Sequence, residues 1–123
     1  MTTMTVEHSV HDPVSVEKKI EELSGRIARG VSVVTAAERE AKARRRDFDL
    51  AYAQAYKRAE GSIKEREYTA DIQTMDKREE VDNAEIAFKH AIRTADSLDK
   101  ELFAWQAILK SVVAMFGAAG VRS

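Results

Sequence analysis

Residues 81–116 read VDNAEIAFKHAIRTADSLDKELFAWQAILKSVVAMF, and their apolar side chains recur in alternating steps of three and four residues. This heptad spacing is typical of a helix that packs one narrow apolar stripe along a partner helix. Gly117 and Gly120 follow the stripe and predict its end, so we expect a helix over residues 74–116. The stripe contains Val81, Ala84, Phe88, Ala91, Ala95, Leu98, Leu102, Trp105, Leu109, Val112 and Phe116.

The first half of the chain carries the same spacing and predicts a helix over residues 15–60. One polar residue, Arg44, stands on this register. Either Arg44 belongs to the stripe, or the stripe shifts there onto Arg45 and Tyr52, because a straight helix slips by about 20° per heptad. The other stripe positions are Val16, Ile20, Leu23, Ile27, Gly30, Val34, Ala37, Ala41, Phe48, Ala51 and Ala55.

The segments outside these two helices lack a helical period. Residues 1–14 are predicted to be a flexible tail that ends in a helix start, with Asp12 as the cap, Pro13 in the first turn, and Ser15 as an alternative cap. Residues 61–73 begin with Gly-Ser and carry charges without a clear stripe, so they are predicted to form a turn, or at most a short extra helical turn. Residues 118–123 are predicted to be a short tail.

These elements predict an all-α protein in which residues 15–117 form a long antiparallel, coiled-coil-like two-helix hairpin. The return of the chain places residues 16–34 beside residues 98–116, where large apolar side chains are more numerous than one partner helix can cover. A surplus of this kind usually marks an interface, so we expect self-association into a four-helix bundle or a larger oligomer. The expected interface residues are Leu102, Trp105, Ile108, Leu109, Val112, Val113, Phe116, Ile20, Leu23 and Ile27.

The composition narrows the class of protein further. A chain of 123 residues is one domain by size, and its 20 basic and 21 acidic residues nearly cancel, so any attraction to nucleic acid must be local. The sequence has no cysteine, which excludes disulfides and thiolate chemistry. It lacks a signal-peptide pattern and any apolar run that approaches the roughly 18 residues of a membrane span, so we expect no membrane partner and a cytoplasmic location.

No motif predicts catalysis, a metal site or a cofactor. His8, His11 and Asp12 are too few ligands for a convincing metal site, and Ser15 to Lys18 match a Ser-x-x-Lys string without the companion motifs of acyl-transferring enzymes. The stripes also lack the Glu-x-x-His pairs that di-iron bundles require. We therefore expect a protein that is not an enzyme.

Basic residues crowd the middle and the end of the first helix. They could neutralise phosphates, and the tyrosines among them could stack on single-stranded bases. The alternative is a solvated face whose charge is balanced by neighbouring carboxylates such as Glu38, Glu40, Asp47 and Asp49. The candidate nucleic-acid-binding residues are Arg39, Lys42, Arg44, Arg45, Arg46, Tyr52, Tyr56, Lys57 and Arg58.

Two segments, AYAQAYKRAEG at residues 51–61 and LDKELFAWQAILK at residues 98–110, resemble a group of small uncharacterised helical-hairpin proteins of phages and prophages. Genes of that group tend to lie near replication and recombination functions. The resemblance implies an accessory protein of the phage DNA machinery in the host cytoplasm, with a phage or host protein or nucleic acid as partner. It implies no catalytic residue. The expected function is a self-associating interaction or scaffold protein, with nucleic-acid binding as the alternative.

Overall fold

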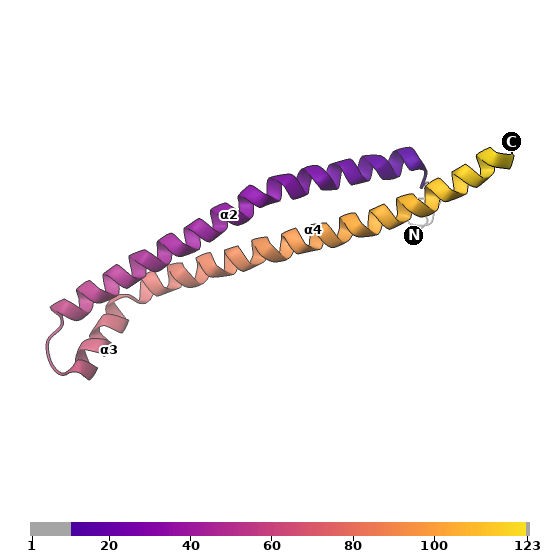
Figure 1. Ribbon diagram of the computed structural model, residues 1–123. Helices are drawn as coiled ribbons and strands as arrows, with labels where there is room; N and C mark the ends of the chain where they lie inside the picture. Colours follow the sequence, from indigo (N-terminus) through magenta and orange to yellow (C-terminus); the bar gives the residue numbers. More distant parts are fainter. Residues whose placement is uncertain (1–10, 123) are drawn as a thin grey trace, which may run out of the picture. The chain divides into compact units, whose positions relative to one another are not determined.

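The computed structural model of the chain describes the backbone of residues 11–122 and the side chains as far as residue 117. Within this part three helices and no strand are present, which confirms the all-α class (Figure 1). Helix α2 spans Pro13–Arg58, α3 spans Ile63–Gln73, and α4 spans Met75–Arg122. The predicted tail at residues 1–10 lies outside the described residues.

The chain divides into two compact units. Unit 1 combines the first part of α2, up to Gly30, with the part of α4 that begins at Thr94. Unit 2, residues Val31–Arg93, contains the rest of α2, all of α3 and the first part of α4. Each long helix therefore contributes one segment to each unit.

Helix α2 begins with a reciprocal pair of hydrogen bonds between Asp12 and Ser15. The backbone N–H of Ser15 donates to Asp12 Oδ1 at 2.9 Å, and the N–H of Asp12 donates to Ser15 Oγ at 3.3 Å. Both backbone N–H groups are satisfied in this way, so Asp12 is the cap and Pro13 the first helical residue. The hydrogen bond from the backbone N–H of Ser15 also holds the pKa of the Asp12 carboxyl below its usual value.

The predicted stripes are the inner faces of α2 and α4. Every stripe position on α2 is buried or half-buried, and Val16 and Leu23 are 0% exposed. Arg44 is half-buried whereas Arg45 is exposed, so the stripe runs through Arg44 and does not shift. On α4 the same holds for every predicted position except Phe116, which is exposed.

The prediction of a turn over residues 61–73 is wrong, because Ile63–Gln73 form the 11-residue helix α3. Ser62 caps this helix by accepting a hydrogen bond from the backbone N–H of Glu65 at 3.2 Å. A Ser-x-x-Glu string is the capping-box pattern of a helix start. Gly61 reverses the chain just before it with a φ of 105°, where a side chain would collide with that of Glu65.

The prediction that the second helix ends at residue 116 is also wrong. Helix α4 continues to Arg122, so residues 118–122 are helical and are not a tail. A glycine ends a helix when it adopts a left-handed conformation, and Gly61 is the one residue within the described part that has a positive φ. Gly117 and Gly120 remain helical, so neither acts as a stop.

A single residue, Thr74, separates α3 from α4. Its side chain is 3% exposed, and its Oγ1 donates a hydrogen bond to the backbone oxygen of Ala70 at 2.7 Å. The backbone N–H of Thr74 donates to the same oxygen at 3.1 Å, and Thr74 O accepts from the N–H of Arg78 at 3.0 Å. Backbone hydrogen bonding is therefore nearly continuous across the break, and the buried residues Ala70, Thr74 and Val81 keep the heptad register of α4.

Candidate interaction surfaces

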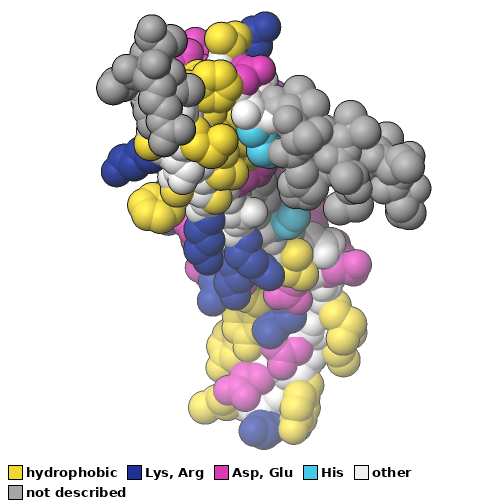
Figure 2. Space-filling view, turned by 90° about the vertical axis from the view of Figure 1, so that its right-hand side faces the viewer, with side chains coloured by type: hydrophobic (Ala, Val, Ile, Leu, Met, Phe, Trp, Pro, Cys, Tyr) yellow, Lys and Arg dark blue, Asp and Glu magenta, His cyan; other side chains and the backbone are white. Residues whose placement is uncertain are grey.

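The last part of α4 exposes large apolar side chains in unit 1. We call Phe103, Val113, Met115 and Phe116 the α4 end patch, and their side chains are 74%, 49%, 70% and 53% exposed. In the space-filling view, hydrophobic side chains reach the surface among Lys, Arg, Asp and Glu side chains (Figure 2). Exposed apolar side chains that gather in this way are typical of contact surfaces.

The exposure of Phe116 follows from where α2 begins. Val112 is buried in unit 1, but Phe116 lies one helical turn further along the same stripe. The last turns of α4 run past Pro13, the first residue of α2, so no α2 residue faces Phe116 within the described part (Figure 1). The stripe thus continues beyond the end of its partner helix.

The residues predicted to form an oligomer interface fall into three groups. Leu23 and Val112 are buried within unit 1 and belong to its core, whereas Val113 and Phe116 are exposed. Phe103 and Met115 are exposed too, although they are not among the predicted interface residues. The remaining predicted residues are half-buried and border the α4 end patch or the core, namely Ile20, Ile27, Leu102, Trp105, Ile108 and Leu109.

His11 contacts α4 through its ring. Its ring meets that of Trp105 edge-on, with 5.3 Å between the centroids and an interplanar angle of 89°. Across residues 11–122, no three His, Asp or Glu side chains gather in a way that could hold a metal ion. His8 lies outside this range.

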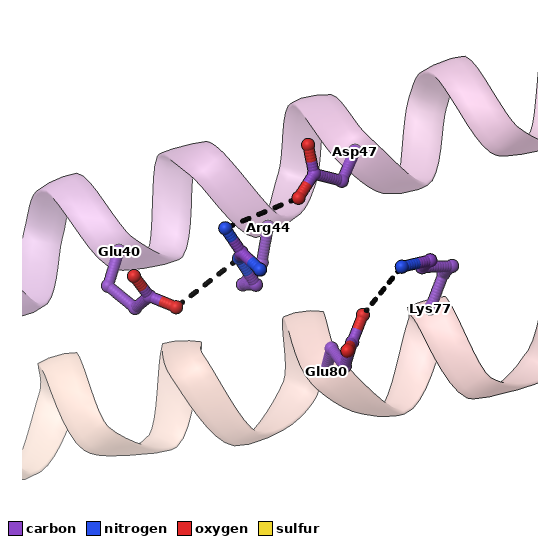
Figure 3. A network of polar contacts seen from close by, with 5 residues as sticks. All are labelled: Glu40, Arg44, Asp47, Lys77 and Glu80. Atoms are coloured by element: carbon purple, nitrogen blue, oxygen red, sulfur yellow. Dashed lines mark ion pairs between the residues drawn. The ribbon is translucent and has the colours of Figure 1, made fainter.

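Some of the predicted basic residues of α2 in unit 2 have carboxylate neighbours, and the others have none within the described residues. The Arg44 side chain lies between two carboxylates of the same helix, with its Nε 3.3 Å from Glu40 Oε1 and its Nη2 3.3 Å from Asp47 Oδ2 (Figure 3). Arg45 lies 4.0 Å from Asp49 and stands over the Phe48 ring at 5.9 Å. The other predicted cations are exposed and have no ion pair within the described part of the chain: Arg39, Lys42, Arg46, Lys57 and Arg58.

The tyrosines are separated from these exposed cations. Tyr52 and Tyr56 are half-buried, and the Tyr52 ring packs against Phe48 with 6.1 Å between centroids. Desolvation raises the pKa of the Tyr52 phenol, and the carboxylates of Asp71 and Glu67 raise it further. Tyr52 is therefore a packing residue at the contact between α2 and α3.

Phe48 lies where the three helices of unit 2 meet. The guanidinium of Arg78 on α4 stands over its ring at 5.1 Å, and Arg78 Nη2 lies 3.9 Å from Asp71 Oδ1 on α3. These residues, with Asp49 and Tyr52, line a shallow pocket of about 250 Å³. The cluster has a clear packing role, because it ties α3 to both long helices.

A second, larger groove lies between α2 and α4 in unit 2, with a volume of about 530 Å³. Its apolar lining comes from Ala41, Phe88 and Ile92, and charges of both signs stand at its rim. The rim is formed by Glu38, Lys42, Arg45, Glu85 and Lys89. Since these charges nearly cancel, the groove shows no preference for a charged ligand.

Comparisons with known proteins give no match: no family model, no curated protein and no solved structure is significantly similar to this chain. Within residues 11–122, no helix has both the length and the hydrophobicity that crossing a membrane requires.

Proposed function

We propose that this chain is a non-enzymatic interaction or scaffold protein that associates with further copies of itself through the α4 end patch. In this proposal α2 and α4 form one long antiparallel hairpin of the coiled-coil type, and two hairpins combine into a four-helix bundle or a larger assembly. Supporting the hairpin, each compact unit contains one segment of α2 and one segment of α4.

The observation that carries the proposal is the exposure of Phe116 on the heptad register. Phe116 is 53% exposed although it continues the stripe on which Val112 is 7% exposed. A helix from a second copy could cover Phe116, since Phe116 continues the stripe on which Val112 is buried. Val113 and Met115 would widen the contact, because they lie about 60° and 100° around the helix from Phe116, on opposite sides of it. Phe103 lies about 140° around the helix from Phe116 and would add to the contact in a bundle of more than two helices.

The apolar burial that the α4 end patch offers is comparable with the free-energy cost of association. Covering one large apolar side chain completely stabilises by about 1.5–3 kcal/mol, so the exposed fractions of the four patch residues correspond to roughly 6 kcal/mol for each copy. Two copies supply about twice that, against an association cost of about 4–15 kcal/mol. At the low end of this cost the balance is about 8 kcal/mol, which corresponds to a dimer that forms at micromolar concentration. A resemblance to phage hairpin proteins supports a role as an accessory factor in an infected host.

Size-exclusion chromatography with light scattering tests the proposal on the full chain. We expect a mass of two or more copies at micromolar protein, and a fall towards the monomer mass for Val113→Asp, which places a charge in the patch. Ile86→Asp is the matched control, because Ile86 is 63% exposed on α4 in unit 2. A monomer mass for the unmodified chain, or an equal loss of mass in both variants, would rule the proposal out.

A further inference from the structure

One side of α2 in unit 2 carries cations directly opposite the buried stripe. Ala41 and Phe48 are buried and seven residues apart, and Arg39 and Arg46 each precede one of them by two residues. At 100° per residue, these arginines point about 160° away from the stripe and into solvent. Lys57 lies on the same side, and Lys42, which also borders the groove between α2 and α4, lies at its edge. We call Arg39, Lys42, Arg46 and Lys57 the outer basic face.

The outer basic face is not neutralised by the chain itself. Arg44 and Arg45 lie nearer the stripe and have carboxylate neighbours at 3.3–4.0 Å. Within the described residues, the four cations of the outer basic face have no ion pair. From Arg39 to Lys57 the face extends for about 27 Å at the rise of an α-helix.

The residues between these cations leave them accessible. Ala43 and Ala53 lie on or beside the same side of the helix and are small, and Leu50, which is 60% exposed, is a large apolar side chain on this side between Arg46 and Lys57. Asp49 stands at the edge of the face, but it is the neighbour of Arg45. A partner with a dense row of negative charge could therefore approach the helix closely along its length.

We propose that the outer basic face binds the phosphate backbone of duplex nucleic acid. Duplex DNA carries one negative charge for about every 1.7 Å of its axis, and its major groove is about as wide as an α-helix. A single strand fits less well, since binding to single strands relies on stacking with aromatic rings. Tyr52 and Tyr56 are half-buried, and Tyr52 is packed against Phe48.

Fluorescence anisotropy with a labelled duplex of mixed sequence tests this inference on the full chain. We expect binding that weakens by about 100-fold between about 50 and 200 mM salt, because four phosphate contacts give a log–log slope of about 3.6. The double variant Arg39→Gln/Arg46→Gln should bind at least about tenfold more weakly and reduce the slope by about two.

The control is Arg44→Gln/Arg45→Gln, which removes the same charge from residues that already have carboxylate neighbours. Its affinity should stay within about twofold of that of the unmodified chain. An equal loss in both double variants, no salt-dependent binding at micromolar protein, or equal affinity for a single strand of the same length would overturn the inference. Displacement of the duplex by polyglutamate that carries the same number of negative charges would also overturn the inference.

Light scattering on the same samples separates this inference from the proposed self-association. Both double variants should keep the mass of the unmodified chain, because the outer basic face lies in unit 2 and the α4 end patch lies in unit 1. Circular dichroism should show unchanged helix content. A loss of duplex binding that appears only together with a loss of mass would contradict a direct role for the outer basic face.

Discussion

Replacing Arg44 with leucine should stabilise the protein. Arg44 occupies a stripe position where its side chain is 33% exposed, and its Nε is buried without a hydrogen-bond partner. The contact of Nε with Glu40 is close enough for an ion pair but is not aligned as a hydrogen bond. A leucine buried to the same extent contributes about 1.5 kcal/mol, and removing an unsatisfied buried donor contributes about 1 kcal/mol more.

The stability that Arg44→Leu loses with the two ion pairs is smaller than these gains. Glu40 and Asp47 are 60% and 48% exposed, so water solvates them when the guanidinium is gone, and each lost ion pair costs less than about 1 kcal/mol. The buried stem of the arginine already provides some of the packing, which lowers the gain. The balance favours Arg44→Leu by about 1 kcal/mol, or an increase of about 4 °C in the unfolding midpoint.

Thermal unfolding followed by far-ultraviolet circular dichroism measures this shift. Arg45→Leu is the control with the same change of charge, and it should raise the midpoint less, because the Arg45 side chain is 59% exposed. The reasoning fails if Arg44→Leu unfolds at a lower temperature than both the unmodified chain and the control. In that case the two carboxylate contacts of Arg44 outweigh the burial of an apolar side chain.

Three further measurements test the packing and the caps. Leu23→Ala should destabilise unit 1 by about 3 kcal/mol in a urea titration, because Leu23 is 0% exposed; a loss below about 1 kcal/mol would contradict its place in the core. The free energy of unfolding of the unmodified chain should exceed that of Asp12→Ala by its full margin above pH 3.8, because the hydrogen bond from Ser15 favours the carboxylate. This margin should decline as the pH falls through the lower pKa of the folded state, and a margin that grows in acid would contradict the prediction. Ser62→Ala should speed amide hydrogen exchange in α3 severalfold, because the cap at Glu65 contributes about 1 kcal/mol, and unchanged exchange would show that the cap is dispensable.

The heptad spacing was sufficient to predict which faces of the long helices are buried. It placed Arg44 correctly on the stripe as one of two alternatives, because a half-buried arginine can keep its charged end near water while its stem packs. The spacing of buried residues depends only on the angle between successive residues of a helix, so it predicts the buried face even where the ends of the helix are not known.

Helix α3 was not predicted, because the residues on its inner face are small. Ala70 and Thr74 are its contacts with the core, and neither produces an apolar stripe in a short, charged segment. The Ser62 to Glu65 string was the available local signal. The exposure of Phe116 depends on the first residue of α2, which spacing does not encode.

Thr74 also fixes the length of the junction between two helices. Ala70 and Val81 face inward on opposite sides of this single residue and are 11 positions apart, which is close to three full helical turns. One inserted residue would turn α3 by about 100° and direct Asp71 inward in place of Ala70. The number of residues at this junction is therefore more constrained than the identity of the residue at position 74. Insertions preserve the packing only in the linker before Ser62 or as whole helical turns.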